Sequence, residues 1–142
     1  MEFALAEIDT KTKAESGVDM QVRKVDGTPL LNPEGKAVMI RLRGIDSDAY
    51  RDASASAIEQ IKQSAENKDD ASTIAKHGEE RAIELLVACT IGWSGILNKD
   101  GEPVMFSADA ARALYRQYPV IRDQVDRFIG VRANFLLGSS KG

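Results

Sequence analysis

Apolar and polar residues alternate along two short stretches in the first third of the chain, residues 18–25 and residues 36–44. Alternation with a period of two places the apolar side chains on one face of a β-strand. Between the stretches lie the turn-forming pairs Asp26-Gly27 and Asn32-Pro33. The pattern therefore predicts two antiparallel strands joined by a loop. The apolar positions are Val18, Met20, Val22, Val38, Ile40 and Leu42.

A two-stranded ribbon of this kind is only marginally stable by itself in water. It must pack on helices, on the N-terminal segment or on another chain. The apolar residues of Phe3–Ile8 offer a third strand for the same sheet.

After Gly44 the spacing of apolar residues lengthens to that of an amphipathic helix. The chain from Asp46 to Asp70 contains neither proline nor glycine, and Asp46 or Ser47 is suited to cap the start of the helix. The apolar face of this helix is thin and rich in alanine. We interpret the polar stretch Gln63–Ser72 at its end as a mobile link.

A second and stronger helical pattern runs to Trp93, the only tryptophan in the chain. Ile83 and Val87 widen its apolar stripe, as expected for a helix at the centre of the core. Gly92 and Gly95 suit a chain that leaves a helix, because glycine adopts left-handed backbone geometry readily. The positions at helical spacing are Ile74, Gly78, Ala82, Leu85, Leu86, Cys89 and Trp93.

Residues 95–106 are predicted to form a short hairpin around the turn Lys99-Asp100-Gly101. Ser107 is suited to cap the helix that follows. Pro119 either ends this helix or opens the next, since proline is tolerated in a first helical turn. Apolar residues continue at close to helical spacing as far as Leu136.

The sequence thus predicts an α+β fold that is mostly helical. An N-terminal antiparallel β-ribbon region, residues 1–45, is followed by a helical region, residues 46–142, with about four helices and the short hairpin around residues 95–106. The length of 142 residues is that of one compact domain. Residues 138–142 are expected to be a flexible tail, and no internal repeat is apparent.

Trp93 is expected to fill the seam between the central helix, the turn segment and the last two helices. In this interpretation the indole Nε1 donates to a carbonyl group of the turn. A contact with a partner protein is the alternative role, because tryptophan often dominates the binding energy of interfaces.

The composition is that of an ordinary globular protein, with 43% hydrophobic and 29% charged residues. The net charge of -3 argues against a nucleic-acid surface, since phosphate binding needs concentrated lysine and arginine. No apolar run approaches the roughly 20 residues that cross a bilayer. The single cysteine, Cys89, is compatible with a reducing cytoplasm.

No catalytic constellation, cofactor motif or metal site is evident in the sequence. His77 is the only histidine, and together with Cys89 it provides too few ligands for a zinc site. Cys89 lies on the apolar stripe and is expected to be buried and unreactive. The glycines of "IGWSG" lack the Gly-Lys-Ser/Thr ending of a phosphate loop. We therefore expect a protein that is not an enzyme and that needs no cofactor.

A series of short motifs follows in order along residues 82–136. A Gly-Trp-x-Gly unit precedes an Asp-Gly-x-Pro turn, a Phe-Ser step into a helix, a Tyr-Pro pair and a closing Arg-Ala-Asn-Phe. In this order and spacing the segment resembles the C-terminal part of tail assembly chaperones of long-tailed bacteriophages. Residues 38–53 are more loosely similar. The principal motif residues, which look structural, are Gly92, Trp93, Gly95, Asp100, Gly101, Pro103, Phe106 and Ser107.

The resemblance implies a protein that binds the tape measure protein while the tail is built and helps to recruit tail tube protein. It also implies a place in the host bacterial cytoplasm and absence from the mature virion. A homo-oligomer stays open as a further association, whereas neither nucleic acid nor a membrane is expected as a partner. Shielding the apolar helices of a tape measure protein requires an apolar surface. The residues expected to contribute it are Tyr115, Tyr118 and Phe135.

Other classes of protein remain as alternatives. A structural virion protein, such as a tail tube or head-tail connector component, would pair its ribbon with neighbouring subunits. An enzyme would need a cleft with a perturbed acidic or histidine group. A helix-turn-helix DNA-binding protein is disfavoured, because the connection from Gly92 to Ser107 is much longer than the usual turn of roughly 3–4 residues.

Overall fold

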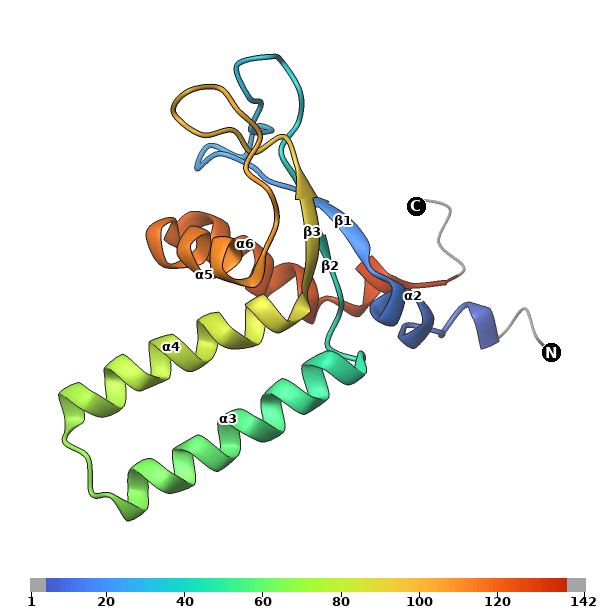
Figure 1. The fold of residues 1–142 in the computed structure, drawn as a ribbon. Helices are drawn as coiled ribbons and strands as arrows, with labels where there is room; N and C mark the ends of the chain where they lie inside the picture. Colours follow the sequence, from blue (N-terminus) through green and yellow to red (C-terminus); the bar gives the residue numbers. More distant parts are fainter. Residues whose placement is uncertain (1–4, 138–142) are drawn as a thin grey trace.

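The computed structural model describes residues 5–137 of the protein (Figure 1). The predicted flexible tail at residues 138–142 lies outside the described residues. The fold is α+β, as predicted, with a three-stranded antiparallel sheet. The helices are α2 (Lys11–Ser16), α3 (Asp48–Glu66), α4 (Ala71–Cys89), α5 (Ala108–Gln117), α6 (Pro119–Gly130) and the 3-10 helix η1 (Arg132–Phe135), and the strands are β1 (Val18–Gln21), β2 (Met39–Leu42) and β3 (Thr90–Ser94).

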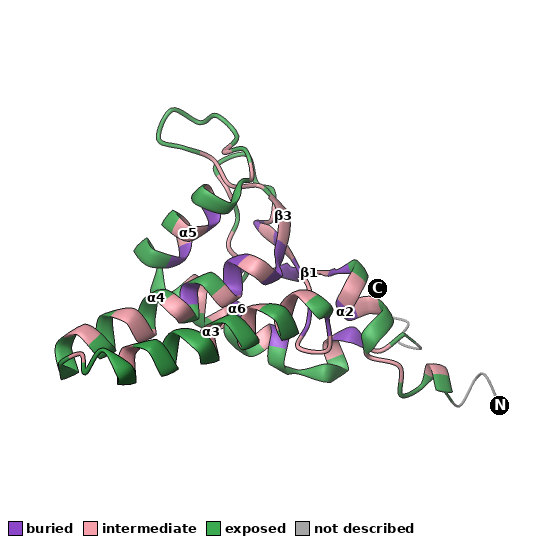
Figure 2. Cartoon of the chain, turned by 60° about the horizontal axis from the view of Figure 1, so that its bottom comes forward, coloured by how far each residue is buried: buried purple, intermediate pink, exposed green. Residues whose placement is uncertain are grey.

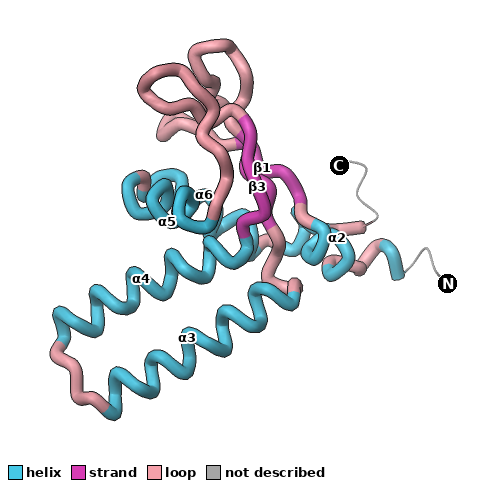
Figure 3. Tube along the Cα trace, in the orientation of Figure 1, coloured by secondary structure: helices cyan, strands magenta, loops and turns pink. Residues whose placement is uncertain are grey.

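The predicted N-terminal ribbon is confirmed as β1 and β2, which pair antiparallel with Met20 opposite Ile40. The apolar side chains point into the core, as the alternation predicts; those fully or almost fully buried include Met20, Val22, Ile40 and Leu42. Figure 3 shows the loops gathered at one end of the sheet and the helices at the other. The helices cover the apolar face of the ribbon and provide the packing that it lacks alone.

The third strand, β3, is formed by residues that the sequence assigned to a helix. Helix α4 ends at Cys89, and β3 then pairs with β2 so that Trp93 lies opposite Ile40. The prediction of a helix through Trp93 is therefore wrong. β2 is the middle strand, and β3 satisfies the backbone groups along its second edge. The β-branched and aromatic side chains of β3 also favour a strand.

The first two residues of the predicted strand Phe3–Ile8 lie outside the described residues, and residues 5–8 do not form a strand. Residues 5 and 6 of the predicted strand Phe3–Ile8 are helical, and residues 7 and 8 form a turn. Helix α2, which the sequence did not predict, follows and buries Ala14. With β3 on the second edge of β2, the sheet has its third strand from another part of the chain.

Helices α3 and α4 form a long hairpin that projects away from the sheet (Figure 1). The side chains of Ser47 and Asp70 accept backbone N–H bonds in the first turns of the two helices. The link predicted over Gln63–Ser72 is shorter than predicted, because α3 continues to Glu66 and the turn comprises only residues 67–70.

The core covers only the second half of α4. Ile74 is 45% exposed, and Ala82 is exposed as well. No residue of α3 is buried, and Figure 2 shows that helix largely exposed. The buried stripe is therefore displaced from the predicted one, since the outer half of α4 has only α3 beside it. The buried residues of α4 are Ile83, Leu86, Val87 and Cys89.

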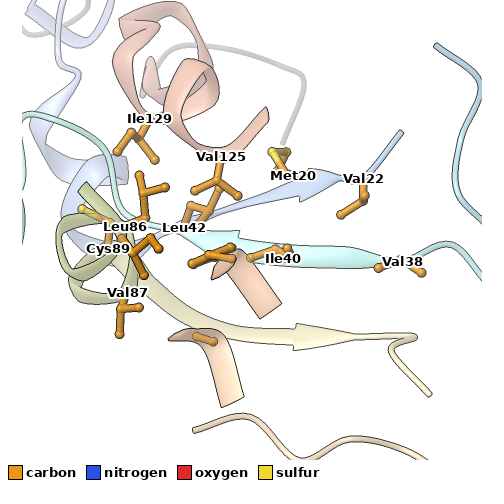
Figure 4. Packing of buried hydrophobic residues seen from close by; sticks show 13 residues of the cluster. Met20, Val22, Val38, Ile40, Leu42, Leu86, Val87, Cys89, Val125 and Ile129 are labelled. Atoms are coloured by element: carbon orange, nitrogen blue, oxygen red, sulfur yellow. The ribbon is translucent and has the colours of Figure 1, made fainter. Parts of the chain in front are cut away.

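The hydrophobic core lies between the sheet and helices α4, α5 and α6. Figure 4 shows Val125 of α6 and Leu86 of α4 close to Leu42 of β2. All three side chains are almost fully buried. Burying an aliphatic side chain of this size stabilises the fold by roughly 1.5–3 kcal/mol. This single cluster holds the β-ribbon against the helices.

The last helical pattern is divided into three elements. Ser107 caps α5, as predicted. Pro119 is the first residue of α6, which is one of the two roles that the sequence left open. Helix α6 ends at Gly130 rather than at Leu136, and η1 follows. The turn brings Phe135 onto Gly44, where a side-chain Cβ would lie only 2.9 Å from the phenyl ring. A side chain at position 44 would therefore collide with the buried ring of Phe135.

Candidate functional site

Three hairpin loops of the same construction lie at one end of the sheet. They are closed by the pairs Arg23–Pro29, Leu31–Ala37 and Leu97–Pro103. In each loop the fifth residue is a glycine with φ between 80° and 88°. The N–H of the second residue donates to the carbonyl oxygen of the sixth at 2.8 Å in all three loops. The structure thus contains a short internal repeat.

The sequence does show this repeat once the loops are aligned. "LNPEGKAV" and "LNKDGEPV" share leucine, asparagine, glycine and valine at the same positions. The expectation that the chain has no internal repeat is therefore corrected. The copies are short and irregularly spaced along the chain, which hides them from a search for a fixed period.

An open apolar groove of about 620 Å³ lies between these loops and the corner where α5 meets α6. Four of its large apolar side chains are strongly exposed: Val25 (87%), Leu31 (53%), Tyr118 (48%) and Val120 (44%). Exposed apolar side chains scattered singly are ordinary, but a group of them around one concave surface indicates a binding site. Further lining residues are Leu30, Val38, Ile96, Leu97, Leu114 and Ile121.

Hydrogen bonds hold the segments around the groove together: one set joins the first loop to α6, and another joins the second loop to the segment after β3. Gln124 of α6 accepts a hydrogen bond from the N–H of Arg23 and donates one to its carbonyl oxygen, both at 2.8 Å. On the other side, the Asn32 side chain donates to the carbonyl oxygen of Gly95 at 3.2 Å. A Cβ on Gly95 would lie 2.6 Å from the carbonyl oxygen of Ala37, so this approach requires glycine. The groove is accordingly preformed.

Positive charge lies at one end of the groove. The groove continues, past Val25 and Val120, into a trough lined by Arg23, Lys24, Arg127 and a single carboxylate, Asp123. Among residues 5–137, none of the three cations takes part in an ion pair. This end of the groove is therefore positive on a chain whose net charge is -3.

Of the three residues predicted to contact a partner, only Tyr118 lines the groove. Tyr115 is fully buried, and its hydroxyl group lies 2.7 Å from that of Thr90. Phe135 is 1% exposed and packs edge-on against Phe128. The prediction that Tyr115 and Phe135 are exposed is wrong, because both aromatic rings face the core. Sequence reasoning did not identify Val25, Leu31 and Val120, which belong to the exposed set.

Trp93 occupies the position that the sequence predicted for its ring nitrogen. Nε1 donates to the carbonyl oxygen of Val104 at 2.8 Å, on the return arm of the third hairpin loop. The indole also meets Phe106 edge-on, with ring centroids 5.1 Å apart. Ser107 follows directly and caps α5. The motif of glycines, turn and aromatic rings thus builds the wall of the groove formed by residues 95–98.

Within the described residues, Cys89 and His77, which could carry chemistry, lie in different parts of the fold. Burial raises the pKa of Cys89 to about 11, so its thiol stays protonated at neutral pH. His77 lies 4.0 Å from Asp69 at the polar tip of the α3–α4 hairpin. Within residues 5–137 there is no cluster of histidine, cysteine and carboxylate side chains that could hold a metal ion. No helix in this part of the chain is long and apolar enough to span a bilayer.

The fold is that of a small α+β protein with an open apolar groove on its surface. Comparison with known families gives its origin. Residues 45–135 match the family of the YdaY prophage protein. The chain belongs to this family. Comparison with curated proteins and with solved structures finds no match.

Proposed function

We propose that the protein is a tail assembly chaperone that binds the tape measure protein during tail morphogenesis and helps to recruit tail tube subunits. The single observation that carries the proposal is the preformed apolar groove with Tyr118 and Val120 on its wall. Membership of a prophage family and the ordered motifs of residues 82–136 support the same assignment.

The physical reason is that a tape measure protein is long and helical and exposes apolar stripes until the tube surrounds it. A chaperone must cover such stripes reversibly, which requires a groove rather than a catalytic centre. The proposal therefore describes a protein that is not an enzyme. It acts in the host cytoplasm and leaves before the virion is complete.

Co-expression with the tape measure protein of the same prophage tests this function. We expect the tape measure protein to be soluble only when the chain is present, and the two to co-purify. Mass spectrometry of purified particles should then detect no copies of the chain. If the tape measure protein is insoluble in both cases and the chain is found in particles, a structural virion protein replaces the chaperone.

A further inference from the structure

We propose that the groove binds an amphipathic α-helix whose apolar stripe is followed by acidic residues, so that the stripe fills the apolar part and the carboxylates lie over Arg23, Lys24 and Arg127. This inference rests on the proposed function, since it gives the chemistry of the partner segment that the groove accepts.

The apolar part of the groove suits a helix better than an added strand. A strand would need free backbone groups along one wall. The N–H groups of Val22, Lys24, Leu30, Asn32 and Val38 on the loop wall are all hydrogen-bonded within the protein. The backbone N–H of Arg23 is taken by Gln124. These donors are closed to an added strand, so the exposed apolar side chains of the groove carry most of the recognition, as when a helix docks by apolar residues at i, i+3, i+4 and i+7.

The trough indicates which charges the bound helix carries. Three cations and one carboxylate line it, directly after Val25 and Val120. Asp26 lies near Lys24, and even with its carboxylate included the three cations outnumber the carboxylates. The guanidinium of Arg23 is held in its own loop, where it donates to the carbonyl oxygen of Gly27 at 2.9 Å. Acidic side chains of a bound helix would thus meet an excess of positive charge. Complementary charges of this kind favour one partner over another and speed association.

Three designed peptides of about 18 residues, each roughly 27 Å long as a helix, are the probes. The first carries a leucine stripe followed by glutamates, the second the same stripe followed by lysines, and the third serines in place of the leucines. Fluorescence anisotropy with the purified full chain measures their binding at low and high salt. We expect the acidic peptide to bind about tenfold more tightly than the basic one, with the difference reduced by salt, and the serine peptide not to bind.

Two variants with the same change of charge locate the effect. Lys24→Glu reverses one charge of the trough, whereas Lys62→Glu reverses an exposed charge on α3 that lines neither the groove nor the trough. Helix α3 projects away from the sheet (Figure 1). We expect Lys24→Glu to remove most of the preference for the acidic peptide and Lys62→Glu to retain it. Equal binding of the acidic and basic peptides, or no binding of either, would overturn the inference.

The outcome is separable from that of the proposed function. If the acidic peptide binds through the trough but the tape measure protein does not co-purify, the groove chemistry stands and the chaperone role falls. If the tape measure protein is kept soluble but Lys24→Glu and the peptides show no charge preference, the chaperone role stands and the inference about the groove is wrong.

Discussion

The side-chain amide of Gln124 and the backbone of Arg23 are joined by one hydrogen bond in each direction, both at 2.8 Å. The two residues are 101 positions apart in the sequence. This pair joins α6 to the arm that leaves β1, and so joins the two walls of the groove. One side chain outside the hydrophobic core therefore makes a direct bond between α6 and the loop arm beside the groove.

Replacing Gln124 by alanine removes both bonds and leaves two backbone groups of Arg23 to water. We expect Gln124→Ala to lower the free energy of unfolding by roughly 1–2 kcal/mol. Urea denaturation followed by the fluorescence of Trp93 measures the change. Gln63→Ala, in an exposed position on α3, is the control and should stay within about 0.5 kcal/mol of wild type. Equal effects of the two substitutions would show that the bond does not hold the walls.

The buried Tyr115 makes stability depend on pH in alkaline solution. Burial raises its pKa to about 12, against about 10 in an unfolded chain. Between these values the unfolded chain loses a proton that the folded protein keeps. The stability that comes from keeping Tyr115 protonated is thus complete below about pH 10. As the pH rises toward 12, the free energy of unfolding falls by about 2–3 kcal/mol.

Tyr115→Phe should flatten the decline between pH 10 and 12, at a cost near 1 kcal/mol at neutral pH for the lost bond to Thr90. Circular dichroism during urea denaturation at several pH values gives the slope. The exposed Tyr118 provides the control, because Tyr118→Phe should keep the wild-type slope. A Tyr115→Phe slope as steep as wild type would contradict a buried, neutral phenol.

The two glycines of the Gly-Trp-x-Gly unit have different roles, which alanine substitution separates. Gly95 has φ +85° and its Cβ would meet the backbone of Ala37, whereas a Cβ on Gly92 would meet nothing within 4 Å. We expect Gly95→Ala to destabilise the protein by more than about 2 kcal/mol. The left-handed backbone alone costs an alanine roughly 1–2 kcal/mol, and the collision with Ala37 adds to it. Gly92→Ala should cost less than about 1 kcal/mol, and thermal denaturation measures both. Similar losses would show that the two positions share one constraint.

Short-range chemistry accounts for the parts of the fold that the sequence predicts well. The alternation around Met20 and Ile40 fixes which face of the ribbon is buried. Ser47 and Ser107 begin helices because their side chains accept backbone N–H bonds, and Pro119 begins one because it needs none. Each of these signals is complete within a few residues.

Long-range pairing accounts for the parts that the sequence does not predict. Residues 90–93 continue a helical apolar stripe, but β2, about 50 residues earlier in the chain, draws them into the sheet. Tyr115 and Tyr118 are three positions apart and both fit the helical pattern of the sequence. Tyr115 is buried and Tyr118 is exposed because of how α5 packs on α4, which the sequence pattern does not show. The groove unites three distant segments, so no single stretch could reveal it.

The most direct test of the central claim uses one substitution in the groove and one outside it. Val120→Glu places a charge on the apolar wall while keeping α6, because a carboxylate in the first turn of a helix is favourable. Ile58→Glu places the same charge on α3, at a side chain that is 56% exposed and does not line the groove.

Both variants are co-expressed with the tape measure protein, and the soluble complex is quantified by affinity purification. We predict that Val120→Glu lowers the yield of complex at least about tenfold, equivalent to 1.4 kcal/mol or more, while Ile58→Glu retains the wild-type yield. A complex that survives Val120→Glu but is lost with Ile58→Glu would place the binding surface on the α3–α4 hairpin and contradict the account.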